Sequence, residues 1–540
     1  MRLFGKITPM QRKVIIWLLI TLLITACTKN TEDEIPTVTP NSYSPFVPLG
    51  ADATIVPVEG GTVVVPSAVP TKRAGPTPTL VPLNIHFPPT RFPGAPIFSP
   101  TPDSPRVLPT PRVEPGSHVV QAGDTLGNIA LQYGVGLEAL MQANGLSDAD
   151  LISPGQALNI PAQSPGEQGP DFKIIPDSEM VNGPASAIFD LNAFVQREGG
   201  YLASYSEEVN GEILSGSQII MLVAQNYSVN PRLLLALLEH QSGWVSQPSP
   251  FSIEYPLGLL DPYHNSLYLQ LTWTANTLNR GYYLWRESAL ATWVLADGSV
   301  LPIAPTINAG TAAVQGFFAS LDDMFTFQGD TTAFGLFQTY FFMFGNPFDL
   351  AIEPLVPANL PQPPMQLPFE SGTVWSFTGG PHGGWDNGSA WAALDFGPPG
   401  EEAGCTPSDE WVVAVADGWI VRTGNGVVMQ DLNGDKVEQT GWAVFYMHIE
   451  SRDRVPPNTY VYAGDRIGHP SCEGGLSNGT HVHIARKYNG EWISADGTNP
   501  FQFEGWVSSG DGIEYDGWLT KGSLVVEAWD GRNELNQIGR

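Results

Sequence analysis

The chain has 540 residues, of which 25 are basic and 54 acidic, and its formal net charge is −29 at pH 7. This length exceeds that of an ordinary single domain and predicts three or four folded units. The acidic excess argues against nucleic acid or an anionic lipid surface as a partner, because both bind clustered Lys and Arg. Hydrophobic residues make up 42% of the chain, and 49 prolines and 57 glycines accompany them, so we expect packed cores separated by linkers and loops.

The N-terminus has the pattern of a secretory signal. Four basic residues and no acidic residue lie in the first 13 positions, before the apolar run VIIWLLITLLITA. This run of about 13 residues is shorter than the roughly 20 that span a bilayer. It ends in ITAC, at Cys27, where the chain resembles bacterial lipoproteins with a lipobox. The resemblance implies removal of residues 1–26 and a diacylglyceryl thioether on Cys27, which would anchor an extracytoplasmic protein to the cell membrane or envelope. A plain signal peptide, or a membrane anchor with an incidental cysteine, is the alternative.

Residues 27–116 are expected to form an extended linker. Twenty of the 49 prolines lie between residues 31 and 116, together with many Thr and Ser residues. Proline removes backbone hydrogen-bond donors, and the segment has no hydrophobic period that could build a core. We therefore interpret it as a stalk without catalytic residues.

Residues 117–163 predict a small βααβ unit. The residues VxxGDTLxxIA, followed by ANGL and IxPGQxLxIP, resemble a LysM module. LysM modules bind the N-acetylglucosamine portions of peptidoglycan or chitin. The resemblance therefore implies a glycan-binding groove near Gly123, Asp124, Thr125, Ser153, Pro154 and Gly155. The same residue types are also typical of turns and helix caps, and Thr125 fits a helix start equally well.

Residues 180–350 are expected to be mostly helical, with two helical runs separated at Asn230-Pro231. The stretches VNPRLLLALLEHQSGW and INAGTAAV resemble soluble lytic transglycosylases, which have a lysozyme-like fold. Two departures argue against glycan cleavage, because the family's catalytic glutamate falls on Gln241 and its tyrosine before Asn-Ala-Gly falls on Ile307.

An amide such as that of Gln241 cannot protonate the leaving oxygen of a glycan. Glu239 is about 200° away around the helix and should face elsewhere. We interpret this unit as an inactive glycan-binding or spacer domain. An unrelated helical bundle and a domain that retains glycan lyase activity are the alternatives.

Residues 366–506 predict an antiparallel β domain, because short strand-like segments alternate with Gly, Asp and Asn turns. This region collects five of the nine histidines, which are His382, His448, His469, His481 and His483. His481 and His483 are one residue apart in a strand-like stretch, so both imidazoles should point to the same side of a sheet. His469, in IGHPS, is expected to be an ordinary turn residue.

A zinc hydrolase needs about three His or carboxylate ligands and one open position for water. His382, Asp395 and His483 could supply the ligands, with His481 and His448 beside the water to move protons. The segments FTGGPHGGW, WAALDF, VFYMHI and GTHVHIAR, in this order, resemble the peptidoglycan metallopeptidase family M23, of the lysostaphin and β-lytic type. The resemblance implies Zn²⁺ on His382, Asp395 and His483, with His448 and His481 as the catalytic pair. It also implies cleavage of peptide bonds in cell-wall stems or cross-bridges.

The common form of the first M23 motif is His-x-x-x-Asp, which would select Asp386 as the ligand. We favour Asp395, because its LDF context is apolar and strand-like and the β-lytic subgroup has a longer spacing. Asp386, in WDNGSA, is typical of a turn. Cys405 and Cys472 lie in the same region, and outside the cytoplasm such a pair can form a disulfide. Zinc ligation by these cysteines is the less favoured alternative.

Residues 507–540 predict further short strands. The whole sequence thus predicts a multidomain α+β protein with a βααβ LysM module, a mostly helical lysozyme-like middle domain and an antiparallel β domain of M23 type. The expected function is that of a lipid-anchored zinc endopeptidase with peptidoglycan as its partner. The alternatives are a non-catalytic peptidoglycan-binding lipoprotein that activates or positions another cell-wall enzyme, and a lipoprotein that only tethers the wall.

Overall fold

The computed structural model describes residues 100–109, 114–121, 124–149, 151–162, 167–400 and 404–540. The predicted signal peptide, Cys27, most of the predicted linker and Gly123 lie outside these residues. Within the described ranges, no helix combines the length and the apolar character needed to cross a membrane.

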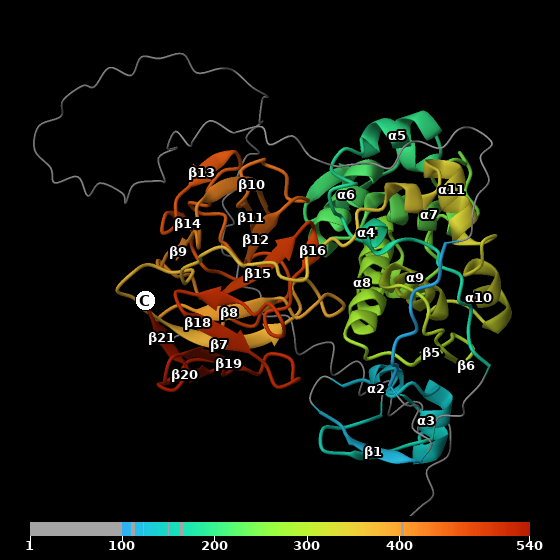
Figure 1. Ribbon diagram of the computed structural model, residues 1–540, viewed down its shortest axis with the longest axis horizontal. Helices are drawn as coiled ribbons and strands as arrows, with labels where there is room; N and C mark the ends of the chain where they lie inside the picture. Colours follow the sequence, from blue (N-terminus) through green and yellow to red (C-terminus); the bar gives the residue numbers. More distant parts are fainter. Residues whose placement is uncertain (1–99, 110–113, 122–123, 150, 163–166, 401–403) are drawn as a thin grey trace, which may run out of the picture. The chain divides into compact units, whose positions relative to one another are not determined.

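The expected βααβ unit is present (Figure 1). Strand β1 (Gly116–Val119) pairs antiparallel with β2 (Ala157–Ile160), and helices α2 (Leu126–Gln132) and α3 (Leu137–Asn144) connect them. The unit has its own apolar core, which consists of Val120, Leu126, Ile129, Ala130, Val135, Leu140, Leu158 and Ile160. It can therefore bury apolar surface without help from the rest of the chain.

The middle region is mostly helical, as its periodicity predicts (Figure 1). Its helices are α4 (Asp177–Met180), α5 (Leu191–Glu198), α6 (Gly216–Tyr227), α7 (Pro231–Ser242), α8 (Leu267–Arg286), α9 (Ala309–Ala319), α10 (Met324–Asp330) and α11 (Leu336–Phe344). Two short hairpins are formed by β3 (Ser206–Val209) with β4 (Glu212–Ser215) and by β5 (Thr292–Val294) with β6 (Val300–Pro302). We call residues 173–358 the helical domain.

The predicted break between two helical runs separates α6 from α7. The Asn230 side chain accepts a hydrogen bond from the backbone N–H of Arg232 at 2.9 Å, and Pro231 occupies the first helical position. Both residues favour the start of a new helix. The six residues 233–238 of α7 are all fully buried, as expected for a helix that is apolar on every side. Helix α7 therefore lies in the core of the helical domain.

The C-terminal region is an antiparallel β domain, which we define as residues 365–540. Its main sheet has the strand order β13-β10-β11-β12-β15-β8-β7-β21, and β16 pairs with β15. These strands are β7 (Val374–His382), β8 (Ala393–Gly397), β10 (Gly418–Gly424), β11 (Val427–Asp431), β12 (Trp442–Met447), β13 (Thr459–Val461), β15 (Val482–Tyr488), β16 (Glu491–Trp492) and β21 (Gln537–Gly539). The smaller sheets consist of β9 (Val412–Val413) with β14 (Arg466–Gly468), and of β17 (Gln502–Phe503), β18 (Trp506–Ser509), β19 (Trp518–Lys521) and β20 (Leu524–Glu527).

The segment 507–540, whose role the sequence leaves open, is built into the β domain. Strand β21 forms an edge of the main sheet, where Ile538 pairs with Trp375 of β7. Both side chains are about 1% exposed, so they belong to the core. The expected boundary at residue 506 therefore does not separate this segment from the β domain.

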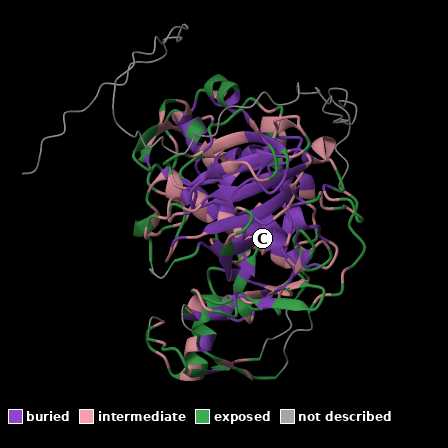
Figure 2. Ribbon diagram, turned by 90° about the vertical axis from the view of Figure 1, so that its left-hand side faces the viewer, coloured by how far each residue is buried: buried purple, intermediate pink, exposed green. Residues whose placement is uncertain are grey.

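Almost every residue of the central strands β8, β11, β12 and β15 is buried, in keeping with the large buried region in Figure 2, so both faces of the main sheet are covered. Along β12, Val444 and Tyr446 belong to the core of the β domain, whereas Phe445 and Met447 belong to a core shared with the helical domain. This alternation follows from the two-residue period of a strand. Ala485 of β15 lies on the same shared side. The helical domain therefore packs against one face of the sheet.

Polar contacts join the same two domains. The Lys487 Nζ atom donates to the Gln225 carbonyl oxygen at 3.1 Å. The Arg422 guanidinium donates to the Asn226 side-chain oxygen at 3.0 Å. The helical and β domains thus share both an apolar core and partly buried hydrogen bonds.

Candidate metal centre

Three central strands position the predicted metal ligands. His382 ends β7, Asp395 lies in the middle of β8, and His483 follows the first residue of β15. In the sheet, β8 lies between β7 and β15, and His483 pairs directly with Asp395. Antiparallel pairing therefore brings together ligands that are 101 residues apart in the chain.

The three side chains converge on one point. The His382 Nε2 atom is 3.0 Å from His483 Nδ1, and Asp395 Oδ1 is 3.3 Å from the first nitrogen and 3.2 Å from the second. Among the described residues, this is the only group of three or more His, Cys, Asp or Glu side chains with ligand atoms this close together. All three are buried. Such spacing matches neighbouring ligands around a zinc ion at about 2.0–2.1 Å.

The remaining hydrogen bonds fix the tautomers of the two histidines. The His382 Nδ1 atom lies 2.8 Å from the Gly380 carbonyl oxygen, and His483 Nε2 lies 3.1 Å from that of Gly384. A carbonyl only accepts, so both of these nitrogens carry protons and the two facing nitrogens present lone pairs. The Asp395 Oδ1 atom is buried without a hydrogen-bond donor. The donor set therefore fits a cation, and backbone carbonyls orient both imidazoles as in metal sites.

The charges in the centre favour an ionised carboxylate. Burial alone would raise the pKa of Asp395, but the neighbouring histidines, above all His382 and His481, hold it well below its ordinary value. Burial lowers the pKa of His483. Burial also opposes protonation of His382, but Asp395, the Gly380 carbonyl and the charge of Glu514 together outweigh it and raise the pKa of His382. One anion thus stands between two imidazoles, which is the charge arrangement that a divalent cation completes.

His448 and His481 lie beside this centre. Their ring centroids are 4.4 Å apart, and His481 Nε2 is 3.7 Å from Asp395 Oδ1. Each donates its Nδ1 proton to a backbone carbonyl, at 3.0 Å to Glu473 and at 2.7 Å to Gly479. Their Nε2 atoms are therefore the ones left to accept a proton.

Burial, together with the neighbouring His481 and His483, lowers the pKa of His448 to about 3. Its imidazole is therefore neutral across the physiological range. His448 also adopts φ 63°, which is uncommon for a residue with a side chain and typical of functional positions.

Asp386, the rival ligand, does not join the cluster. Its Oδ2 atom accepts a hydrogen bond from the Tyr227 hydroxyl at 3.1 Å, and its backbone has φ 56°. This is the turn geometry that its sequence context predicts. His469 is also separate, because its Nδ1 atom donates to the Glu410 carbonyl at 2.8 Å and its ring packs on Trp411. The structure pairs Cys405 with Cys472 in a disulfide, so neither thiol is available to a metal.

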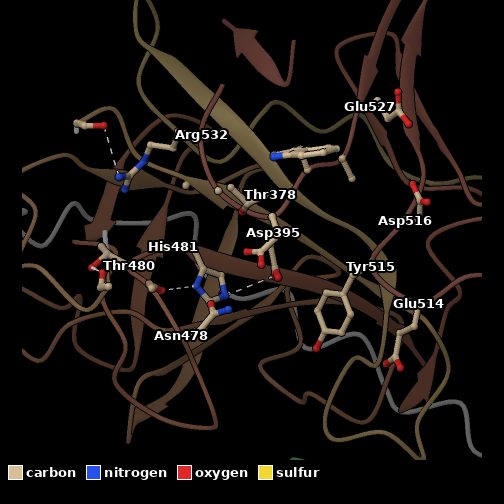
Figure 3. Close-up of a pocket in the computed structure, with 18 of the residues that line it drawn as sticks. Thr378, Asp395, Asn478, Thr480, His481, Glu514, Tyr515, Asp516, Glu527 and Arg532 are labelled. Atoms are coloured by element: carbon tan, nitrogen blue, oxygen red, sulfur yellow. Dashed lines mark hydrogen bonds and ion pairs between the residues drawn. The ribbon is translucent and has the colours of Figure 1, made fainter. Parts of the chain in front are cut away.

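A cavity of about 1050 Å³ opens beside Asp395 and His481 (Figure 3). Tyr515, which the sequence analysis did not single out, lines this cavity and stacks on His382 with ring centroids 4.2 Å apart. Tyr515 has φ 68°, so the chain holds an aromatic residue in a left-handed conformation at the cavity wall. No local motif marks this residue, because it lies 133 positions after His382 in the chain.

The predicted glycan contacts of the βααβ unit divide into two groups. Asp124 accepts hydrogen bonds from His118 Nε2 and from the Gln121 backbone, both at 2.8 Å, and Thr125 accepts from the Asn128 backbone at 3.1 Å. Both side chains thus have structural partners. Ser153, Pro154 and Gly155 lie in an exposed turn before β2, and Gly155 has φ 86°.

In the helical domain, Glu239 contacts the loop that follows α7. Its carboxylate accepts hydrogen bonds from the backbone N–H groups of Val245 and Ser246, at 3.0 and 2.9 Å. It therefore clamps the loop that follows α7. Gln241 is partly exposed beside Gly258, and Ile307 is fully buried.

Two regions match known domain families. Residues 173–358 match the family described as "LasA, N-terminal domain", and residues 118–161 match the LysM domain. The helical domain therefore corresponds to a domain type that LasA contains, and its likeness to lysozyme stays a prediction.

Relatives are found for several parts of the chain. Protease LasA of Pseudomonas aeruginosa PAO1 is 28% identical over 351 residues, which cover 60% of this chain and 75% of LasA. The spore coat assembly protein ExsA of Bacillus cereus is 48% identical over 48 residues, which cover 9% of this chain and 8% of ExsA. Among solved structures, the M23 metalloprotease pseudoalterin is 24% identical, with a TM-score of 0.26, and the match covers 31% of this chain and 96% of that one. The catalytic domain of lysostaphin from Staphylococcus simulans is 25% identical, with a TM-score of 0.17, over 22% of this chain and 87% of that one. The chain therefore carries a LysM domain and is homologous to a bacterial protease.

Proposed function

We propose that this protein is a zinc-dependent endopeptidase of peptidoglycan. The observation that carries the proposal is the convergence of His382 Nε2, Asp395 Oδ1 and His483 Nδ1 within 3.0–3.3 Å, beside two further histidines and an open cavity. The homology to Protease LasA supports a peptidase, and the LysM domain supports a substrate in the cell wall.

His382, Asp395 and His483 would hold the zinc ion. When bound, zinc lowers the pKa of a water molecule and polarises the carbonyl group of the peptide bond. The Gly380 and Gly384 carbonyls accept the outward protons of the two histidines and fix the orientation of the rings.

His448 and His481 would move the protons. One of the two Nε2 atoms accepts a proton from water as the water oxygen bonds to the peptide carbonyl carbon. The pair then returns a proton to the leaving nitrogen as the carbon–nitrogen bond breaks, so that a carboxylate and an amine are released. The low pKa of His448, about 3, keeps that imidazole neutral before the reaction.

The other regions would hold the enzyme at its substrate. A lipid on Cys27 would anchor the chain outside the cytoplasm, and residues 27–116 would let the folded domains reach the wall. The LysM domain would bind glycan through Ser153, Pro154 and Gly155, which lie in the exposed turn before β2. The helical domain would act as a spacer or a second glycan contact without cleaving glycan.

The test is digestion of purified peptidoglycan by the full chain, with and without a chelator, beside Asp395→Asn and Asp386→Asn. Both variants replace a side-chain carboxylate with an amide of nearly the same shape, so they make the same chemical change at two positions. We expect Asp395→Asn to lose zinc by more than roughly 100-fold in affinity and to release no new peptide amines. Asp386→Asn should keep both properties, because an amide oxygen can still accept the Tyr227 hydrogen bond.

The outcomes separate the candidate functions. Chelator-sensitive release of new amines, identified by mass spectrometry, supports the endopeptidase and names its bond. Zinc binding without cleavage on several wall types would favour a binding protein that positions another enzyme. Loss of zinc in Asp386→Asn alone would contradict the ligand assignment.

A further inference from the structure

The chain between His382 and Asp395 forms the connection from β7 to β8, which we call the ligand loop (residues 383–392). This loop supplies the Gly384 carbonyl oxygen, which lies 3.1 Å from His483 Nε2. The carbonyl accepts the outward proton of that imidazole and sets the direction of the ring. The position of the ligand loop therefore affects the orientation of a metal ligand on another strand.

Two side chains of the helical domain hold the outer part of the ligand loop. Asn276 of α8 donates through Nδ2 to the Asn387 side-chain oxygen at 2.8 Å, and its Oδ1 atom accepts from the Gly388 backbone N–H at 2.7 Å. The Tyr227 hydroxyl, at the end of α6, donates to Asp386 Oδ2 at 3.1 Å. Three consecutive loop residues are therefore hydrogen-bonded to the helical domain.

Close packing accompanies these hydrogen bonds. Trp385 packs edge to face on Tyr227, which is 6% exposed, with ring centroids 6.0 Å apart. A methyl group on Gly388 would lie 2.1 Å from the Asn276 backbone oxygen. This distance is far below van der Waals contact, so the loop backbone lies directly against α8.

A second path joins the helical domain to Gly384 through Trp492. The Trp492 ring is 2% exposed, and its Nε1 atom donates to the Tyr227 carbonyl oxygen at 3.4 Å. A methyl group on Gly384 would lie 2.6 Å from the same ring. The position of Gly384 therefore depends on an indole that the helical domain contacts.

Hydrogen bonds within the ligand loop connect its outer part to Gly384. The Gly384 N–H donates to the Ala390 carbonyl oxygen at 3.0 Å, and the Trp385 N–H donates to Ser389 Oγ at 3.0 Å. The Ser389 hydroxyl in turn donates to the Asp386 carbonyl oxygen at 3.2 Å. A shift of the residues bonded to the helical domain is thus transmitted to Gly384 through contiguous contacts.

We propose that Tyr227 and Asn276 are positioning residues of the metal centre. By fixing the ligand loop, they hold the Gly384 carbonyl where it orients His483 for zinc. This inference rests on the proposed zinc site and adds a role for the helical domain, which is then a working part of the metal centre as well as a spacer or glycan contact.

Zinc affinity of the full chain, measured by competition with a chromogenic chelator, tests the inference without turnover. One double variant, Tyr227→Phe with Asn276→Leu, removes the hydrogen bonds to the ligand loop. The matched control, Tyr282→Phe with Asn226→Leu, removes bonds that cross the same domain interface to β16 and β10. Both control residues are buried, so this control disturbs the interface at least as much.

A second pair of variants changes the ligand loop and leaves the helical side chains intact. Gly388→Ala places a methyl group against the backbone of α8. Gly329→Ala in α10 is its control, because the same methyl group there meets no atom within 4 Å. This pair keeps the inference testable if the first double variant fails to fold.

We expect both loop variants to bind zinc roughly ten-fold more weakly, and both controls to stay within about two-fold of the unaltered chain. The visible absorption of bound Co²⁺ depends on ligand geometry, so its bands should shift in the loop variants alone. Urea unfolding of the zinc-free proteins should show comparable stability losses in the two double variants, which separates positioning from a general loosening of the interface.

Unchanged zinc affinity and Co²⁺ absorption in the loop variants would overturn the inference, as would equal losses of affinity in the two double variants. Failure of the unaltered chain to bind zinc would overturn it together with the proposed function. Digestion of peptidoglycan by the same proteins separates the two otherwise. Weaker zinc binding in the loop variants alone, without cleavage by the unaltered chain, supports the inference and removes the endopeptidase, whereas cleavage with equal zinc affinity in every variant does the reverse.

Discussion

The pH dependence of stability that Lys487 causes tests whether the helical and β domains pack together in solution. The lysine side chain is 3% exposed, on the sheet face that the helical domain covers. The Nζ atom donates to the Gln225 carbonyl at 3.1 Å and lies 4.1 Å from the centroid of the Trp492 ring. The substitution Lys487→Met keeps a long flexible side chain and removes the amine.

Burial lowers the pKa of Lys487 from 10.5 to about 7. The unfolded chain therefore binds this proton more tightly than the folded protein, and protonation favours unfolding. The penalty is fully present below the folded pKa of about 7 and disappears as the pH rises past 10.5. At about 1.4 kcal/mol per pKa unit, it amounts to about 5 kcal/mol at pH 6 and about 2 kcal/mol at pH 9.

The assay is urea unfolding of the unaltered chain and of Lys487→Met at pH 6, 7.5 and 9. The advantage of the variant in free energy of unfolding should be about 3 kcal/mol larger at pH 6 than at pH 9. Lys521→Met, which changes an exposed lysine of β19, is the control and should show no such trend. Parallel stability curves for Lys487→Met and the unaltered chain would refute the burial of this amine, and with it the domain packing in solution.

Three further predictions concern the site and its support. His448→Gln should keep zinc, measured by elemental analysis, and lose at least about 100-fold in peptidase kcat, because the amide cannot accept the proton; unchanged kcat would remove His448 from the mechanism. Cys405→Ser should lower the free energy of unfolding by about 2–4 kcal/mol in urea titrations, because it opens the disulfide to Cys472. Thr125→Ala should destabilise the LysM domain by about 1 kcal/mol, measured by hydrogen exchange of α2, and Thr125→Ser should restore it; a loss of glycan affinity in both would instead indicate sugar contact.

The sequence predicted those parts of the fold that depend on local patterns. The turn at Asp124 and the helix start at Thr125 in the βααβ unit, and the Asn230-Pro231 start of α7, are stabilised by hydrogen bonds between residues that are close in the chain. Local sequence also distinguishes Asp386 from Asp395. Asp395 lies in an apolar stretch that forms strand β8, whereas Asp386 lies in a polar stretch that forms a turn with positive φ.

The helical domain shows where a short resemblance ends. The stretches around Gln241 and Ile307 resemble lytic transglycosylases, but residues 173–358 as a whole match the N-terminal domain of LasA. Gln241 has an amide where the transglycosylase motif has its glutamate, and the Glu239 carboxylate accepts hydrogen bonds from the backbone of Val245 and Ser246.

The sequence by itself determined the residue types of the centre and their order along the chain, because zinc ligands and proton carriers must be His or carboxylate side chains. Tertiary structure alone decided which of them meet. The order of β7, β8 and β15 in one sheet sets the 3.0–3.3 Å distances, and no local pattern encodes that order. It also decided that Tyr515 and other residues of the C-terminal segment form a wall of the cavity, and that the helical domain covers one face of the sheet. His382 contacts His483 and Tyr515, which follow it by 101 and 133 positions, so long-range packing rather than local propensity determines these contacts.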